Sequence, residues 1–468
     1  MKFLLKNTFF AIFLSFFSIF SNITYSSDFR YVKDIQVGNE PVGVFYDSKN
    51  DIFHIFCKGT DKDFDGNYEP DQGDTLPSWW VLKIDRIGEV KNLTKVKEFP
   101  FASIPFPFRP AFVPSERKIW INHSDGIVAY NLDTYEQIDE KINISGVTSL
   151  DYKSGHLLIS QSSFSGNLDT AFVYSINQKK IMNKYPIGIN LVQASMYQPK
   201  NPDYKGIVAI SVGNFGSDSS VFHKAIFPHF QLPKFKDTLI GNTANFLEVI
   251  DDQFVAIPVM VSNKVVLTDL YNENYFTEIA LGEPGWDGPS YVKFLPISQS
   301  QNPRQYLLLI TNYDGLFEIY KFSYQTFENG VEYLIEHLET IDLVQKGEAL
   351  AFSEIDKDGN SIVVVANSLK SDYSPNNKVS IVLLGKLFTS ISQNFSSNNL
   401  FKLKDNSIEF LGEIKENTEF AIYDIFGNKV ISTTEQKIIS LVNLSSGVYF
   451  AKVFGDEMIH NFKFTFLK

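Results

Sequence analysis

Short stretches of alternating hydrophobic and polar residues recur along the chain from residue 28 to residue 387, separated by turn-forming Gly, Asn, Asp and Ser. Ile52-Phe-His-Ile-Phe56 and Lys118-Ile-Trp-Ile121 are typical, and such alternation indicates strands because successive side chains point to opposite faces of a sheet. Three strands form one copy, and seven copies begin near Pro41, Pro110, Val147, Val192, Phe246, Tyr291 and Glu348. The repeat predicts an all-β fold, a seven-bladed β-propeller spanning residues 28–387.

The fourth copy is the least regular, because a long loop from Asn214 to Phe235 is expected to interrupt it. The two ends of the repeat suggest how the ring closes. Phe29–Val37 alternates like a strand but belongs to no copy, whereas the seventh copy ends with Val379–Leu384. Joining these two strands would remove two open sheet edges, so we expect them to pair.

A Ser/Asn-rich stretch at 388–400 predicts a linker, and a second all-β module follows at 401–468. Phe420–Ile425 alternates and runs into a turn at Phe426-Gly427-Asn428, and further alternating runs follow up to Leu467. About seven short strands in so few residues predict a small immunoglobulin-like β-sandwich.

Two motifs of this tail carry a resemblance to a known family. Ile-Tyr-Asp-Ile-Phe-Gly-Asn-Lys-Val at 422–430, followed by Leu-Ser-Ser-Gly-Val-Tyr-Phe-Ala-Lys-Val at 444–453, resembles the C-terminal sorting domain of type IX secretion system cargo in Bacteroidetes and their relatives. The Pro-Asn-Pro that often opens such domains is missing, and residues 394–399 stand in its place. The propeller is also similar to surface-layer and YVTN-type propellers of exported bacterial proteins, in its Pro-Val-Gly-Val opening at 41–44.

The resemblance implies that the tail engages the type IX machinery and delivers the chain, through the periplasm, to the outer-membrane surface or the medium, with removal of the tail. The N-terminus fits this route. A basic start at Met1–Lys6 precedes an apolar run at Phe9–Phe20, which is too short to span a bilayer. Small residues near Ser26 predict a signal peptide over residues 1–26, and its cleavage would leave no transmembrane segment; the alternative is a retained membrane anchor.

The amino-acid composition limits which classes of partner the chain can bind. The 43 Phe and 22 Tyr favour strands, and the net charge of -12 without a long basic run argues against a nucleic-acid partner. The single cysteine, Cys57, excludes an intramolecular disulfide and is expected to be a small buried hydrophobe.

No motif for the common hydrolases is present: the chain has no Gly-x-Ser-x-Gly, no His-Glu-x-x-His and no phosphate loop. We therefore expect a secreted or surface-displayed binding or scaffold protein for an extracellular glycan, peptide or protein. The polar residues expected at the entrance of the innermost strands are Glu40, Arg109, Gln193, Asn245 and Glu348. They could bind a sugar or peptide, or form a water-filled rim with no specific role. The alternative function is a lactonase-type hydrolase in which Glu40, Glu348 and Asn245 hold a divalent ion.

Two further places could bind a metal. His223 and His229 lie close in sequence, although the aromatic residues around them also suit a packed loop. The stronger candidate is an acidic stretch between two strands of the first copy, in which alternate carboxylates precede Gly66 as in an oxygen-ligated calcium loop. Its candidate ligands are Asp61, Asp63, Asp65, Glu69, Asp71 and Asp74. Gln72 stands where an EF-hand has its bidentate glutamate, so Asp71 or Asp74 would replace it; the alternative is a solvated acidic turn.

Overall fold

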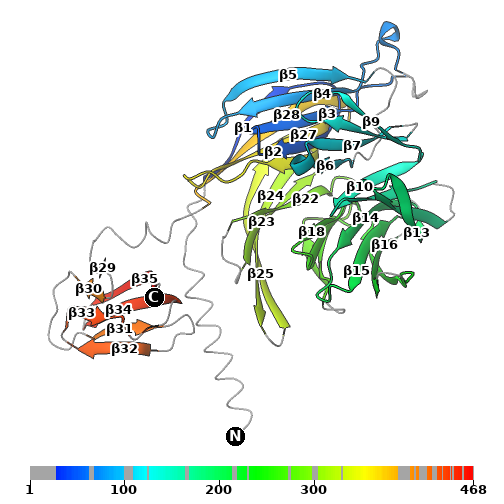
Figure 1. Cartoon of the computed structure of the whole chain (residues 1–468). Coiled ribbons are helices and arrows are strands. Elements are labelled where there is room, and N and C mark those ends of the chain that lie inside the picture. The colour runs from blue at the N-terminus through cyan, green and yellow to red at the C-terminus, as the bar shows by residue number, and fades with distance from the viewer. Residues whose placement is uncertain are drawn as a thin grey trace. The chain divides into compact units, whose positions relative to one another are not determined.

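The computed structural model describes residues of two compact units, one over Ser26–Leu387 and one that contains the C-terminal module (Figure 1). The description starts at residue 28 and ends at residue 466. Its gaps are 63–67, 100–108, 124–125, 164–167, 213–218, 229–230, 272–275, 298–303, 328–329, 388–400, 405–406, 411–418, 424–428, 435, 443, 445–446 and 456–457. The signal-peptide and linker predictions therefore fall outside the described residues.

The larger unit is a seven-bladed β-propeller, which confirms the predicted fold class. Each blade is an antiparallel sheet of four strands among the described residues, written here from the innermost strand outwards. Blades 1 to 3 are β2 (Pro41–Asp47), β3 (Ile52–Cys57), β4 (Ser78–Ile84) and β5 (Val90–Glu98); β6 (Ala111–Val113), β7 (Lys118–His123), β8 (Gly126–Asn131) and β9 (Gln137–Ile142); and β10 (Val147–Lys153), β11 (His156–Gln161), β12 (Leu168–Ser175) and β13 (Lys180–Ile189).

Blades 4 to 7 complete the ring. They are β14 (Leu191–Tyr197), β15 (Tyr204–Ser211), β16 (Ser219–Pro228) and β17 (Lys236–Asn242); β18 (Glu248–Ile250), β19 (Phe254–Val259), β20 (Lys264–Asp269) and β21 (Phe276–Ala280); β22 (Pro289–Pro296), β23 (Arg304–Asn312), β24 (Leu316–Phe327) and β25 (Gly330–Asp342); and β26 (Lys346–Phe352), β27 (Ser361–Leu369), β28 (Pro375–Gly385) and β1 (Asp28–Gln36). In the part of the chain that is described, the helical elements are two 3-10 turns, η1 (Pro70–Gln72) and η2 (Pro114–Glu116).

The predicted three-strand copies correspond to the inner strands, and most of the outer strands escaped the sequence pattern. The inner and middle strands are buried on both faces, as in β3, where all six residues are buried. The outer strand β5 carries exposed polar side chains over most of its length. Hydrophobic alternation is weak in a strand that contacts the core on only part of one face.

One prediction about blade 4 is wrong. The expected loop from Asn214 to Phe235 contains the ten-residue strand β16, which pairs with β15 from Tyr204↔Pro228 to Ser211↔Val221. Its buried positions include Ser220 and His223 as well as Phe222. Polar residues on the buried side removed the expected alternation. Hydrogen bonds compensate for their burial: Ser220 Oγ accepts the backbone N–H of Ala244 at 2.8 Å, and the contacts of His223 are described below.

Strand β1 closes the ring as predicted. It pairs antiparallel with β28, from Asp28↔Gly385 to Gln36↔Lys378, so the N-terminal strand completes the last blade. Asp34 joins the closure by accepting a hydrogen bond from Ser380 Oγ at 2.8 Å. One continuous hydrophobic cluster then packs blade 7 against blades 6 and 1, through residues such as Leu309, Val365 and Ile55.

Hydrophobic clusters fill the spaces between the other blades as well, so the core is a ring of interfaces rather than one central mass. Cys57 lies fully buried in the cluster around blade 1. Burial raises the pKa of its thiol to about 12, which fits the predicted role as a small buried hydrophobe.

The C-terminal module contains two sheets in its described residues. One has the order β29 (Phe401–Lys404), β30 (Ser407–Phe410) and β33 (Ile438–Ser440), and the other β32 (Lys429–Thr434), β31 (Glu419–Tyr423), β34 (Gly447–Gly455) and β35 (Met458–Phe466). Phe410, Phe420 and Leu441 are buried in its hydrophobic core. The immunoglobulin-like arrangement of these strands stays a prediction. No helix among the described residues of the whole chain is long and apolar enough to cross a membrane.

The ring closure can be tested with Ile35→Pro. Val37 N donates to Asn377 O at 2.8 Å, and Ile35 is paired with Val379 two residues earlier, so the Ile35 N–H also points toward β28. Proline removes that donor and clashes with the ladder, and we expect a loss of about 3 kcal/mol in the free energy of unfolding, measured by denaturant titration. Ile35→Ala is the control for the side chain alone. Equal stability of the two variants would contradict closure by β1.

Candidate functional site

The innermost strands of six blades surround a cavity of about 480 Å³ in the central channel. Two of the predicted channel residues, Arg109 and Gln193, line it. Arg109 directly precedes β6 in blade 2, and Gln193 lies on β14 in blade 4. The sequence prediction thus located part of the cavity wall, and the remaining wall consists of residues that it did not identify.

Arg109 forms one end of the cavity. Only 8% of the residue is exposed, and its guanidinium lies 4.8 Å from the ring centroid of Phe246 and 4.5 Å from that of Tyr291. Nη2 donates to the carbonyl of Leu247 at 3.2 Å. That is the one hydrogen bond of this guanidinium to the described residues, although the group carries five N–H donors. Arg109 is therefore held in place by two aromatic rings while most of its donors stay available.

Asp151, on β10, is a second charged group of the cavity wall, and it is half-buried. Its Oδ2 accepts the backbone N–H of Met196 at 3.0 Å. Burial raises the pKa of Asp151, and the Met196 hydrogen bond and the charge of Arg109 oppose that rise. Arg109 and Asp151 form no ion pair within 4.0 Å, although both line the same described cavity.

The other charged groups of the wall already have partners. Lys293 Nζ contacts both carboxylate oxygens of Glu248, at 2.8 and 2.9 Å, and Arg109 Nη2 lies 3.7 Å from Glu248 Oε2. Lys153 forms an ion pair with Asp252. Within each pair the two charges offset each other, which lowers the cost of partly burying them at the channel.

Gln193 acts as a connection between blades. Its Oε1 accepts the backbone N–H of Leu247 in blade 5 at 2.9 Å, and its Nε2 donates to Ser195 Oγ at 3.0 Å. Both ends of the amide already form hydrogen bonds within the cavity wall. Gln193 therefore fixes the shape of the cavity rather than binding a ligand.

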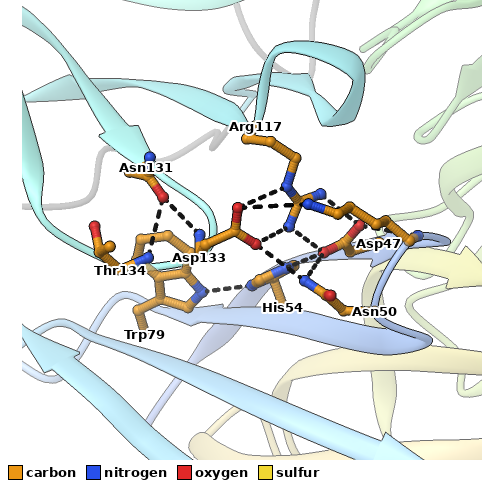
Figure 2. A network of polar contacts seen from close by, with 9 residues as sticks. Asp47, Asn50, His54, Trp79, Arg117, Asn131, Asp133 and Thr134 are labelled. Carbon is orange, nitrogen blue, oxygen red and sulfur yellow. Dashed lines mark hydrogen bonds and ion pairs between the residues drawn. The ribbon is translucent and has the colours of Figure 1, made fainter.

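An apolar wall is formed by Phe45 of blade 1 and Phe112 of blade 2, whose rings are stacked at 5.3 Å between centroids. Behind them lies a polar network (Figure 2) in which Arg117 binds both Asp47 oxygens at 2.7 Å and both Asp133 oxygens at 3.1 and 2.7 Å. This fork joins blade 1 to blade 2. It therefore fixes the relative position of the two strands that carry the aromatic wall.

His54 connects the network to the wall, because its ring lies 5.8 Å from the Phe112 ring. Trp79 Nε1 donates to His54 Nδ1 at 3.1 Å, so Nδ1 is the unprotonated nitrogen (Figure 2). Burial lowers the pKa of His54, which keeps the ring neutral with its proton on Nε2, 3.8 Å from Asp47 Oδ2. Burial alone would raise the pKa of Asp47, but the two hydrogen bonds and the charge of Arg117 hold it below its usual range.

Three predicted channel residues lie apart from this cavity. Glu348 Oε2 accepts hydrogen bonds from Tyr313 and Ser368, and burial raises its pKa to about 7. Glu40 forms an ion pair with Lys58 at 3.2 Å, and Asn245 Nδ2 donates to the carbonyl of Pro289 at 3.5 Å. No group of three or more His, Cys, Asp or Glu among the described residues is arranged to hold a metal. An ion held by Glu40, Glu348 and Asn245 stays a prediction.

The acidic loop of blade 1 is described in part, because Asp63 and Asp65 lie outside the described residues. Asp74 closes the loop: its carboxylate accepts the backbone N–H groups of Lys62 at 3.0 Å and of Glu69 at 2.9 Å. These two hydrogen bonds lower the pKa of Asp74. Glu69 in turn accepts from Gln72 Nε2 at 2.7 Å. Asp74 thus has a structural role, whether or not it also contacts a metal.

A hydrogen-bonded row in blade 4 went unrecognised in the sequence. His223 bonds Ser211 Oγ through Nε2 and Asp237 Oδ1 through Nδ1, both at 2.7 Å, while His229 lies outside the described residues. The row has the spacing of a hydrolytic triad, but its exposure is reversed: the Asp237 side chain is 60% exposed and Ser211 is buried. A Cβ on Gly188 would lie 2.6 Å from Ser211 Oγ, so the backbone of blade 3 covers the hydroxyl.

Blade 7 explains what such a row does. Asn367 Nδ2 donates to Ser380 Oγ, which donates to Asp34 Oδ1, each at 2.8 Å. These residues occupy the same positions in the strand pairing as Ser211, His223 and Asp237. Since the same positions form a row with different side chains, we interpret both rows as cross-strand connections that stabilise the blade.

The comparisons with known proteins identify the tail. Residues 398–464 match the secretion system C-terminal sorting domain, as the motifs of the tail predicted. No curated protein sequence matches the chain. The WD40 β-propeller domain of Doa1 is similar in structure, with a TM-score of 0.51 at 12% identity, over 78% of this chain and 99% of that one. This likeness confirms the propeller.

Two more distant structures complete the comparison. The extracellular domain of BT4673 from B. thetaiotaomicron has a TM-score of 0.42 at 12% identity, and this chain covers 59% of its length while 94% of this chain is matched. Hydrazine synthase of Kuenenia stuttgartiensis has a TM-score of 0.47 at 10% identity, over 76% of this chain and 100% of that one.

Calcium binding by the acidic loop stays a prediction. With an affinity of order 0.1 mM, 1 mM calcium would stabilise the protein by about 1.4 kcal/mol. Calorimetric titration of the wild type should show binding heat that is lost in Asp63→Asn and kept in Asp203→Asn, a surface control in blade 4. Absence of heat in the wild type at millimolar calcium would leave the solvated acidic turn as the correct interpretation.

Proposed function

We propose that this chain is an exported binding protein whose propeller holds an extracellular glycan, peptide or protein in the cavity beside Arg109. The proposal rests on the guanidinium of Arg109. It is nearly buried, donates one hydrogen bond to the described residues and lines a cavity of about 480 Å³. Cavities of roughly 300–1,000 Å³ with a few convergent polar groups are typical ligand sites. Arg109 lines the cavity, so a ligand placed there can accept hydrogen bonds from its remaining N–H donors.

The packing of the cavity supports binding over a purely structural role. Phe246 and Tyr291 orient the guanidinium, Gln193 joins two blades of the wall, and the Arg117 network stabilises the aromatic side. A site held in one conformation loses little entropy when its ligand arrives. The hydrolase alternative has its ion at Glu40, Glu348 and Asn245, which are not among the lining residues of this cavity.

The sorting domain implies handling by the type IX machinery and localisation at the cell surface or in the medium. Within that route, we further propose that a signal peptide over residues 1–26 directs the chain to the periplasm. The tail then directs transfer across the outer membrane and is removed.

Ligand binding is tested by probing glycan and peptide arrays with the full chain. Arg109→Met keeps the length and apolar contacts of the side chain but removes its donors, so we expect at least a tenfold loss of affinity for any ligand of the cavity. Arg86→Met, which changes a partly exposed arginine between β4 and β5 that does not line the cavity, is the matched control. A ligand that binds wild type and Arg109→Met equally would place its site elsewhere and contradict the proposal.

Export is tested by deleting residues 398–468 in a host that has the machinery. We expect the truncated chain to accumulate, folded, in the periplasm, because the signal peptide acts but the sorting domain is missing. Quantification of the protein in medium, surface and periplasmic fractions checks this. Equal amounts outside the cell with and without the tail would rule out sorting by the tail.

A further inference from the structure

The chemistry of the cavity wall selects among the ligand classes left open above. We propose that the cavity takes a neutral saccharide, in which hydroxyl groups bridge Arg109 and Asp151 while a ring face packs on Phe45 and Phe112; this inference rests on the proposed function. The first reason is charge. The wall holds three cationic side chains, Arg109, Lys153 and Lys293, and three acidic ones, Asp151, Glu248 and Asp252, so its formal charge is zero.

A charged ligand fits this balance poorly. The Lys293–Glu248 and Lys153–Asp252 pairs already satisfy each other, so a carboxylate or ammonium ligand would have to compete with an existing partner. An ion moved into a buried site without a new partner of opposite charge loses its hydration and gains little in return. A neutral polar ligand leaves these pairs intact.

The second reason is the combination of donors and acceptors. Arg109 offers only donors, whereas Asp151 in its ionised form offers only acceptors, and no ion pair within 4.0 Å joins these two described groups. A hydroxyl group both donates and accepts, so one hydroxyl, or two on adjacent carbons, can satisfy both side chains at once. A carboxylate would suit Arg109 but repel Asp151, and an ammonium would suit Asp151 but repel Arg109.

The third reason is the apolar wall. Phe45 and Phe112 are half-buried and stacked, and neither ring carries a polar atom. A pyranose ring has a polar rim of hydroxyl groups and an apolar C–H face. The rim suits Arg109 and Asp151, and the apolar face suits the rings of Phe45 and Phe112. The cavity volume of about 480 Å³ is large enough for one or two such rings.

The experiment compares three probe classes on the full chain by calorimetry. The first is a panel of neutral methyl glycosides and disaccharides built from glucose, galactose, mannose and N-acetylglucosamine. The second contains the corresponding uronic acids, and the third contains zwitterionic dipeptides. We expect at least one neutral saccharide to bind, and its uronic acid to bind at least tenfold more weakly.

Two variants locate that binding. Asp151→Asn should lower the affinity for the neutral saccharide at least tenfold, whereas Asp203→Asn should leave that affinity unchanged. Phe45→Leu keeps an apolar wall without an aromatic face and should weaken it as well, which provides a second readout if Asp151→Asn fails to fold. Saccharide affinity unchanged in both folded variants would overturn the inference.

The outcomes separate this inference from the proposed function. Binding of uronic acids or dipeptides with loss in Arg109→Met, and no binding of neutral saccharides, would overturn the saccharide inference but leave the cavity as the binding site. Array ligands that bind independently of Arg109 would overturn both.

Discussion

The pairing of β1 with β28 is the constraint on which the rest of the propeller depends. A ring of sheets has no open end once its first and last strands share a blade, whereas the same chain without that pairing would expose two sheet edges. The closure also buries apolar surface, because one cluster continues from blade 6 through blade 7 to blade 1. Polar contacts also fix the alignment of the strands in this blade. Ser380 hydrogen-bonds both Asn367 and Asp34, so it connects three neighbouring strands.

The closed ring determines the geometry of the cavity. No single blade contains it: Arg109 precedes β6 in blade 2, yet its hydrogen bond goes to Leu247 just before β18 in blade 5, and its aromatic neighbours precede or belong to blades 5 and 6. Every contact of this kind depends on the ring having the right circumference. The Arg117 network shows the same principle between adjacent blades, because Asp47 belongs to blade 1 and Asp133 follows β8 of blade 2.

Buried polar rows recur in the blades and account for residues that look functional in isolation. Ser211, His223 and Asp237 have the spacing of a catalytic set, but their exposure is reversed and blade 7 carries a row in the same register. Exposure and register, rather than residue type, therefore distinguish a structural row from a reactive one. The same reasoning directs attention to the buried Arg109 and the half-buried Asp151, because both line a cavity.

The sequence by itself determined the number of blades, the inner three strands of most of them, the closing strand and the sorting motifs of the tail, since each of these rests on a local pattern or on one long-range pairing. It missed the polar outer strands such as β5 and the strand β16, whose buried serine and histidine hide the alternation. Of the residues that it predicted at the channel, Arg109 and Gln193 line the cavity, whereas Glu40, Asn245 and Glu348 are not among the lining residues. Only the tertiary structure decided that Asp151, Glu248 and Phe45 join Arg109, because strand alternation indicates which face a side chain occupies and not which residue of another blade it meets.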